Sequence, residues 1–474
     1  MLLSLLISAF AFAASDGEGL PLKTPKSVGM SSERLAKIDH VVQRGIAAGG
    51  YPGAAVVVGR RGAAVWEKGF GRLGWEKTSP WVSADRTIYD LASLTKVVGT
   101  TTAIMVLYDE GKVRLDEPVK TYIPEFSGGD KDRVTVRMLL EHRSGLPAGR
   151  DLWRIARTPD EARQAVISTP LGCEPGRCYE YSDLGADMLG FIVEAVSGER
   201  LDQFLSERVF TPLGMTDTGF RPADSLKARI APTETNSPRG YGLQGEVHDE
   251  NAFALGGVAG HAGLFSTAAD LAVFAQTMLN GGEYNGTRIV ADSTVALFTT
   301  RAAGTRALGW DTCGGSGSCG KYLGADAYGH TGFTGTSIWL DPDRDMFVIL
   351  LTNRVHDARA KRPAKVIADV RADLADAAAL AVTDYGDGML AMPAAFRADR
   401  AVDWNRPERH ARRHVVSKAK KKTSTTKGKA TATKSSAAKR SAAKSSSSKP
   451  SSSKTSAAKA KTSASKTTPK KSTR

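Results

Sequence analysis

TIYDLASLTKVVGTTTAIMVLYDEG, residues 87–111, is the stretch from which the rest of the chain is interpreted. It begins with a short apolar run, turns at Ala92–Ser93, and continues as a predicted helix of small and β-branched residues. A helix that is apolar on nearly every side is usually buried in the middle of a domain. The stretch therefore predicts a buried helix with two polar side chains, Ser93 and Lys96, at its N-terminus.

Ser93 and Lys96 are one helical turn apart, so the predicted helix places them on one face. The hydroxyl would lie in the positive end of the helix dipole, with an ammonium within reach. This suits a serine nucleophile, because a cation or base helps the proton leave and backbone N–H groups can hold the oxyanion. The alternative is that Ser93 only caps the helix. The S-x-x-K spacing alone does not decide, since it recurs at 436–439 and 441–444.

The positive charge of the chain is concentrated at its C-terminus. The formal net charge is +15, but residues 411–474 hold 20 Lys and Arg and no acidic residue, which leaves −5 for the remainder. We expect residues 401–474 to be a disordered basic tail that attracts polyanions. Residues 411–474 contain no aromatic side chain to stack on bases, so nothing indicates sequence-specific nucleic-acid binding. An anionic envelope polymer is the expected partner, and a merely solvating tail is the alternative.

The N-terminus, MLLSLLISAFAFAASDG, has the pattern of a secretory signal, with cleavage after Ala13 or Ala14 and a signal segment 1–14. No Lys or Arg precedes the apolar run, and a buried N-terminal helix is the alternative. The run is too short to span a membrane, and no other stretch of 18 apolar residues follows. We expect a periplasmic or extracellular protein without a transmembrane span.

The four cysteines form two local pairs, Cys173 with Cys178 and Cys313 with Cys319. In an exported chain this spacing predicts two short-range disulfides. A zinc site is the alternative, but four and five intervening residues differ from the two that zinc sites usually have. We expect no metal and no organic cofactor.

The predicted elements change in kind along the chain. A helix begins at Ser31–Ser32, and helices dominate from about residue 100 to 280. A closing helix is expected at 363–381. Strands are expected at 54–59, 63–69, 307–310, 336–340 and 346–352. This order predicts one composite α/β domain, residues 15–400, whose sheet is assembled from both chain ends around a helical insertion.

Two further motifs accompany Ser93 and Lys96. They are Tyr181–Ser182–Asp183, at a turn before a helix, and His330–Thr331–Gly332, at the start of a strand. The set S-x-x-K, Y-S-N and K-T-G or H-T-G, in this order, resembles the serine β-lactamase and penicillin-binding-protein superfamily. Over residues 25–385 the chain is most similar to the branch of class C β-lactamases, DD-peptidases of the H-T-G type and related esterases. The resemblance implies a β-lactamase-like fold, with an antiparallel sheet flanked by helices and a mainly helical subdomain.

The resemblance also implies roles. Ser93 would be acylated, Lys96 would hold its proton network, and Tyr181 would carry the proton to the leaving group. His330, Thr331 and Gly332 would line one wall of the site, with Gly332 allowing the substrate backbone to approach closely. The oxyanion hole would be the backbone N–H groups of Ser93 and Phe333.

Two residues depart from the family pattern. Asp183 stands where asparagine is usual, so it would favour the charged form of Lys96 and repel a substrate carboxylate unless it is paired. His330 stands where lactamases have lysine, so a fixed positive charge is mostly absent at pH 7. Both departures argue against an efficient β-lactamase.

The loop GGVAGHAGLFSTAADL borders the site by resemblance, and its His261 would be part of the substrate wall or a structural loop residue. The 173–178 disulfide would steady the approach to Tyr181. We therefore expect an exported serine hydrolase that forms an acyl-enzyme with a small ester, an amide or a peptidoglycan-like substrate, either as an esterase or as a D-amino-acid peptidase. The alternatives are a DD-carboxypeptidase or weak β-lactamase, and a non-catalytic envelope-binding protein.

Overall fold

A computed structural model describes residues 19–406, except 303, 315–316, 387–388 and 402–403. Its centre is a six-stranded sheet in the order β2-β1-β11-β10-β9-β8, with every neighbouring pair antiparallel. The strands are β1 (Gly53–Arg60), β2 (Ala63–Gly71), β8 (Asp311–Thr312), β9 (Tyr328–Thr331), β10 (Ser337–Asp341) and β11 (Met346–Thr352). The sheet therefore joins the two ends of the domain, as predicted.

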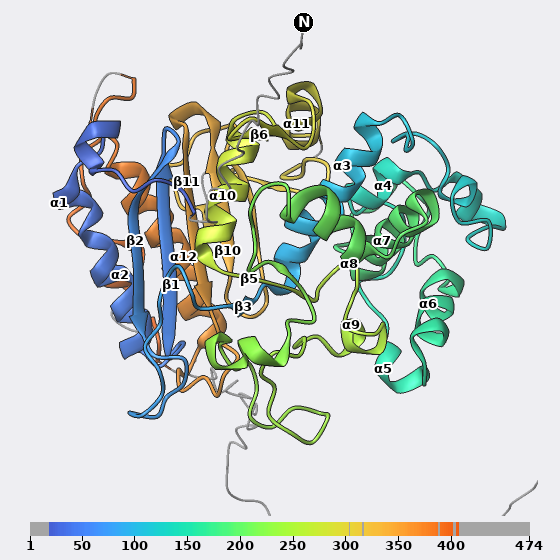
Figure 1. Cartoon of the computed structure of the whole chain (residues 1–474), viewed down its shortest axis with the longest axis horizontal. Coiled ribbons are helices and arrows are strands. Elements are labelled where there is room, and N and C mark those ends of the chain that lie inside the picture. Colours follow the sequence, from blue (N-terminus) through green and yellow to red (C-terminus); the bar gives the residue numbers. More distant parts are fainter. Residues whose placement is uncertain (1–18, 303, 315–316, 387–388, 402–403, 407–474) are drawn as a thin grey trace, which may run out of the picture. The chain divides into compact units, whose positions relative to one another are not determined.

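Strand β1 is apolar on both faces because helices cover both sides of the sheet (Figure 1). Ala54, Val56 and Val58 belong to one core cluster, with α2 (Lys37–Ala47) and α12 (Pro363–Leu380). Ala55 and Val57 belong to the larger cluster on the other face, which includes α10 (Ala268–Leu279). Between Gly53 and Gly59 the strand holds only glycine, alanine and valine, so both layers can pack closely on it.

The second part of the domain is mainly helical, and its helices lie to the right of the sheet in Figure 1. These helices are α3 (Thr102–Asp109), α4 (Val136–Leu140), α5 (Leu152–Ile155), α6 (Pro159–Ser168), α7 (Asp183–Ser197), α8 (Leu201–Leu205), α9 (Glu250–Ala254) and α11 (Asp292–Thr299). The remaining α-helices are α1 (Ser32–Leu35) and α13 (Arg397–Arg400). This arrangement confirms the predicted composite fold.

The described residues also form two smaller sheets. One has the order β3-β5-β4, from β3 (Tyr89–Asp90), β4 (Gly219–Phe220) and β5 (Leu264–Ser266), and the other pairs β6 (Glu283–Tyr284) with β7 (Thr287–Arg288). The first of these holds the segment before Ser93, since β3 pairs with β5 through Tyr89 and Ser266.

The predicted strand at 307–310 is wrong. Gly309 has φ +85°, and the Ala307 N–H donates to the Trp310 carbonyl at 3.0 Å, so these residues form a tight turn. The strand β8 begins only at Asp311. The predicted first helix is interrupted at Ala36, which separates α1 from α2.

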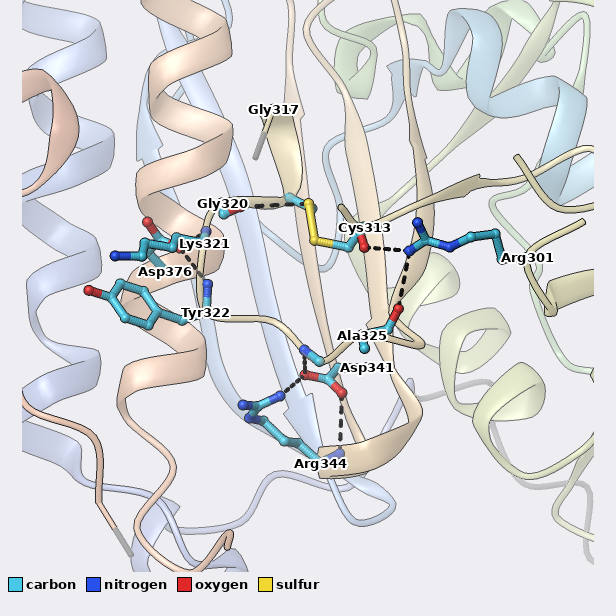
Figure 2. The surroundings of a disulfide bond; sticks show 12 residues. Arg301, Cys313, Gly317, Gly320, Lys321, Tyr322, Ala325, Asp341, Arg344 and Asp376 are labelled. Atoms are coloured by element: carbon cyan, nitrogen blue, oxygen red, sulfur yellow. Dashed lines mark hydrogen bonds and ion pairs between the residues drawn. A yellow bond between two sulfur atoms is a disulfide. The ribbon is translucent and has the colours of Figure 1, made fainter. Parts of the chain in front are cut away.

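Both cysteine pairs are disulfide-bonded. Around Cys313–Cys319 (Figure 2), the Arg301 guanidinium donates to the Cys313 carbonyl at 2.8 Å, and the Lys321 N–H donates to the Asp376 carboxylate of α12. The disulfide thus closes a loop that is fixed to α12. The predicted signal segment 1–14 and most of the predicted tail lie outside the described residues. Among the residues that the structure describes, no helix is both long and apolar enough to cross a bilayer.

Candidate active site

The turn before Ser93 is held in an unusual backbone conformation. Ala92 has φ +47°, a region that non-glycine residues seldom occupy. The buried Asp90 carboxylate accepts the Ala92 N–H at 2.8 Å and, with its other oxygen, the His248 N–H at 2.7 Å. Burial raises the pKa of Asp90 despite these bonds. Sequence reasoning missed Asp90, which joins the turn to the loop on the opposite side of the pocket.

Lys96 connects Ser93 to Asp183. Its Nζ lies 2.9 Å from the Ser93 Oγ, 2.7 Å from Asp183 Oδ1 and 3.1 Å from the His261 carbonyl oxygen. Only 3% of Lys96 is exposed. Burial would lower the pKa of Lys96, but the neighbouring Tyr181 and Asp183 outweigh it and raise the pKa above the usual lysine value. Lys96 is therefore an ammonium at neutral pH, and it compensates the charge of Asp183.

Helix α7 brings Tyr181 and Asp183 to this lysine. Ser182 caps the helix by accepting the Gly185 N–H at 3.1 Å, and the Ser182 N–H donates to His142 Nδ1 at 3.1 Å. The cap places Asp183 in the first turn, where the helix dipole favours a carboxylate. The Tyr181 ring then lies 5.0 Å from Lys96 Nζ.

Three side chains surround the Tyr181 ring. The imidazoles of His142 and His330 have centroids 4.6 and 6.0 Å away, and the Arg306 guanidinium lies 5.3 Å from the ring centroid. His142 comes just after α4, and its Nδ1 accepts the Ser182 N–H. Burial and the charge of Arg306 lower its pKa well below the usual histidine value.

His330 is neutral, and a fixed positive charge comes from elsewhere. Its Nδ1–H donates to the Thr331 carbonyl at 2.9 Å, which leaves the Nε2 lone pair 3.5 Å from Arg306 Nη1. Burial, with the charges of Arg306 and Lys96, lowers the pKa of His330 well below the usual range. The nearby cation is therefore Arg306, which is also paired with Asp311 at 3.0 Å.

The ring of His261 is buried between two carboxylates. Nδ1 lies 2.7 Å from Asp187 Oδ1 and Nε2 lies 3.0 Å from Asp249 Oδ1. Burial alone would lower the pKa of His261, but the two carboxylates outweigh it and raise the pKa well above the usual value. The imidazolium fixes the loop whose carbonyl accepts from Lys96.

Strand β9 and the loop after it close against the nucleophile turn. Thr334 Oγ1 donates to the Asp90 carbonyl at 2.7 Å, and Thr336 Oγ1 donates to the Leu91 carbonyl at 2.9 Å. A Cβ on Gly332 would lie 2.4 Å from the Leu91 carbonyl oxygen. Gly332 therefore packs closely against the nucleophile turn, and the approach of the substrate backbone to Gly332 stays a prediction.

Ser93 opens into a pocket of about 420 Å³. Ser93, Tyr181 and Phe333 line it, while Lys96, His330, Thr331 and Gly332 do not. Phe333 is 61% exposed. Its ring centroid lies 5.7 Å from that of His248 and 4.5 Å from the Arg354 guanidinium. The carboxylates at the pocket are Asp183, Glu234, Asp249 and Glu250, and the side chains paired with them are, in the same order, those of Lys96, His248, His261 and Arg239.

The structure thus brings together all of the predicted site residues, in a pocket and the layer behind it. It adds Asp90, His142, Asp187, Asp249 and Arg306. Of these, only Asp187 had a usable signal, since it lies one helical turn after Asp183. No group of three or more His, Cys, Asp or Glu residues in the described part of the chain is arranged to hold a metal ion.

Known proteins are similar to this chain in sequence and in fold. A family model described as Beta-lactamase matches residues 38–372. A relative from Escherichia coli, named "Putative D-alanyl-D-alanine carboxypeptidase", is 35% identical over 393 residues, covering 75% of this chain and 90% of the relative. A penicillin-binding protein homologue from Caulobacter crescentus has a TM-score of 0.58 at 23% identity, covering 74% of this chain and 98% of that one. A class C β-lactamase has a TM-score of 0.58 at 17% identity, covering 72% and 96%.

Proposed function

The chain belongs to the β-lactamase family of serine hydrolases, and from that premise we propose that it cleaves a peptide ending in D-alanine through an acyl-enzyme on Ser93. The observation that carries the proposal is the contact of Lys96 Nζ with both Ser93 Oγ and Asp183, at the base of an open pocket. The name of the Escherichia coli relative supports the substrate. The hydrolase family and the intact Ser93–Lys96 pair argue against the non-catalytic alternative.

In the first step the Ser93 Oγ attacks the substrate carbonyl carbon. Lys96 already carries its proton, because its pKa is raised, so Tyr181 is the better acceptor for the serine proton. A phenolate at Tyr181 is stabilised by the adjacent ammonium of Lys96 and by Arg306. Tyr181 then gives the proton to the leaving nitrogen as the C–N bond breaks. In the second step water attacks the acyl carbon, Tyr181 takes the water proton, and Tyr181 gives this proton to Ser93 Oγ as the C–O bond to the acyl group breaks.

The charges at the pocket permit a substrate carboxylate. Asp183 is paired with Lys96, which removes the repulsion that an unpaired Asp183 would cause. Arg354 lies against Phe333 at the pocket edge and forms no ion pair with any described residue. We propose that it attracts the terminal carboxylate of the peptide.

A small ester is the second candidate substrate. The exposed face of Phe333 favours it, because an aromatic ring at the pocket edge can bind an apolar acyl or leaving group. Both substrates would form an ester with Ser93, and they differ in the acyl group that Ser93 carries and in the group that leaves.

Intact mass spectrometry tests the proposal and separates the substrates. The protein and Ser93→Ala are each mixed with an N-acylated peptide ending in D-Ala-D-Ala, with p-nitrophenyl acetate and with benzylpenicillin, and free D-alanine is measured. We expect D-alanine release and an adduct that is absent in Ser93→Ala. Turnover of the ester alone would favour the esterase, and no adduct with any compound would refute the acyl-enzyme.

We further propose that the protein is exported and that its basic tail contacts an anionic envelope polymer. The apolar N-terminus and the two disulfides support export. Fractionation of cells should find the protein in the periplasm or the medium. Deletion of residues 411–474 should abolish salt-sensitive retention on the envelope polymer and leave turnover of the small ester unchanged. Retention that persists after the deletion would contradict the role of the tail.

A further inference from the structure

Arg371 of α12 is a buried cation that binds backbone instead of a carboxylate. Arg371 is only 9% exposed, and its Nη2 donates to the Gly332 carbonyl at 2.6 Å and to the Thr336 carbonyl at 2.8 Å. No acidic side chain in the described part of the chain pairs with it. Burial and the charge of Arg354 lower the pKa of Arg371 to about 9, so the guanidinium is still charged at neutral pH.

The two carbonyls that Arg371 holds lie at the two ends of one short loop. Residues 332–336 connect β9 to β10, and Thr334 and Thr336 join this loop to the nucleophile turn. The Gly332 N–H donates to the Thr336 carbonyl at 2.8 Å, so Arg371 binds where the hairpin ladder ends. Arg371 therefore acts on the loop from the face opposite the pocket.

The orientation of one peptide group follows from this contact. In a trans peptide the C=O and the following N–H point in opposite directions. The Gly332 carbonyl points to Arg371, and the Gly335 N–H also donates to it at 3.1 Å. The Phe333 N–H consequently points away from α12. No described residue accepts a hydrogen bond from this N–H, and Phe333 itself lines the pocket with Ser93.

We propose that Arg371 is a positioning residue that locks the Gly332–Phe333 peptide, so that the Phe333 N–H faces the oxygen of the substrate carbonyl. The inference rests on the proposed function and on the oxyanion hole that the family resemblance implies, in which the N–H groups of Ser93 and Phe333 are the two donors. The charge adds to the effect, because a cation on the carbonyl polarises the peptide and strengthens its N–H as a donor. A donor fixed in advance needs no reorganisation when the oxyanion forms.

Arg60 is a matched control for a purely structural role. It is also a buried arginine, 2% exposed, and it donates to the carbonyls of Val28, Gly29 and Arg344. Unlike Arg371, it also pairs with a carboxylate, that of Asp384, at 2.6 Å. It lies at the end of β1 and does not line the pocket. Arg60→Lys should therefore lower stability without changing the oxyanion hole.

The test compares Arg371→Met, Arg371→Lys and Arg60→Lys with the wild type. The melting temperature, kcat and KM for p-nitrophenyl acetate, and the affinity for phenylboronic acid are measured for each. Phenylboronic acid forms a tetrahedral adduct with a serine and places an oxygen where the oxyanion would lie. Arg371→Lys keeps the positive charge but lacks the planar guanidinium that binds two carbonyls. It provides the same comparison if Arg371→Met does not fold.

We expect kcat to fall about 10- to 100-fold in the Arg371 variants, less than the 10²–10³ that removal of a whole oxyanion donor costs. KM should stay within about threefold, and boronate affinity should fall in parallel with kcat. Arg60→Lys should lower only the melting temperature. Folded Arg371 variants that keep the wild-type kcat and boronate affinity would overturn this inference and leave the proposed function standing. Losses of kcat and boronate affinity in Arg60→Lys equal to those in the Arg371 variants would do the same. A wild type without turnover or boronate adduct would overturn the proposed function as well.

Discussion

Replacing His261 with alanine would leave two carboxylates without their shared cation. Asp187 is fully buried, and its Oδ2 already lacks a hydrogen bond from any described residue. Asp249 keeps the N–H groups of Asn251 and Ala252, each at 2.9 Å, because it caps α9. The cost of the substitution therefore falls mainly on Asp187.

The size of the effect can be worked out for neutral pH. Removing one partner of a buried ion pair costs about 3–5 kcal/mol. The unfolding entropy of a domain of about 390 residues is about 0.8 kcal/mol/K, so the melting temperature should fall by about 4–6 °C at pH 7.5. Relief by protonation of Asp187 is small at this pH, since it costs about 1.36 kcal/mol for each pH unit above an ordinary aspartate pKa.

Acid should reduce the deficit. The pKa of His261 is raised on folding, so its contribution is complete below about pH 6.5 and is lost as the pH rises through the folded value. From pH 7.5 to 5.0 the wild type thus gains about 1.4 kcal/mol from this group. The variant gains up to about 3.4 kcal/mol, because Asp187 takes up a proton on folding. The deficit should therefore shrink by about 2 kcal/mol.

Thermal unfolding followed by circular dichroism at pH 5.0 and 7.5 measures this difference. Met188→Ala is the control, because Met188 is fully buried beside Asp187 in the sequence and carries no charge. Its deficit should be about the same at both pH values. An equal deficit for His261→Ala at both pH values would show that lost packing, and not unpaired charge, explains the cost.

Three further predictions concern catalysis. Asp183→Asn should lower the pKa of Lys96 and move the alkaline limb of the kcat profile to lower pH, and an unmoved limb would contradict the role of the ammonium. Gly332→Ala should reduce kcat at least about 100-fold, because its Cβ would collide with the Leu91 carbonyl and displace an oxyanion donor. A wild-type kcat for Gly332→Ala would show that the loop 332–336 can move to accommodate the Cβ. Replacing both cysteines of 173–178 should cost about 2 kcal/mol at most in urea unfolding and lower kcat. Unchanged kcat would remove the proposed link to Tyr181.

Much of the fold could be predicted because its signals are local. The apolar run of β1 and the proline at the start of α12 indicate their elements directly. The strand at 307–310 could not be predicted correctly, since the left-handed conformation of Gly309 is set by its surroundings. A Cβ there would lie 2.2 Å from Thr101 Oγ1, a contact between residues far apart in the chain.

The residues of the candidate site also fall into two groups, those that a local motif indicates and those that it does not. Ser93, Lys96 and Tyr181 lie in short motifs, so sequence alone could group them. Arg306 belongs to no motif and comes to Tyr181 only because the turn before β8 folds back beside β9. The positive charge that is missing at the neutral His330 is supplied by Arg306, and this could be recognised only from the structure. The same holds for the two carboxylates on His261, which approach from α7 and from the N-terminus of α9.

The pairing of β1 with β11 has a consequence for how the chain is made. Val57 is paired with Ile349, so the first hairpin has no partner on that edge until nearly the whole domain has been synthesised. During that interval an apolar strand with an open edge invites pairing with other chains. The Phe333 N–H also arrives after Ser93, so a nascent chain carries the serine without this part of its site. A holding chaperone should therefore matter more for the yield of this enzyme than for proteins with local pairing, and the first catalytic turnover should come only after the last strand is in place.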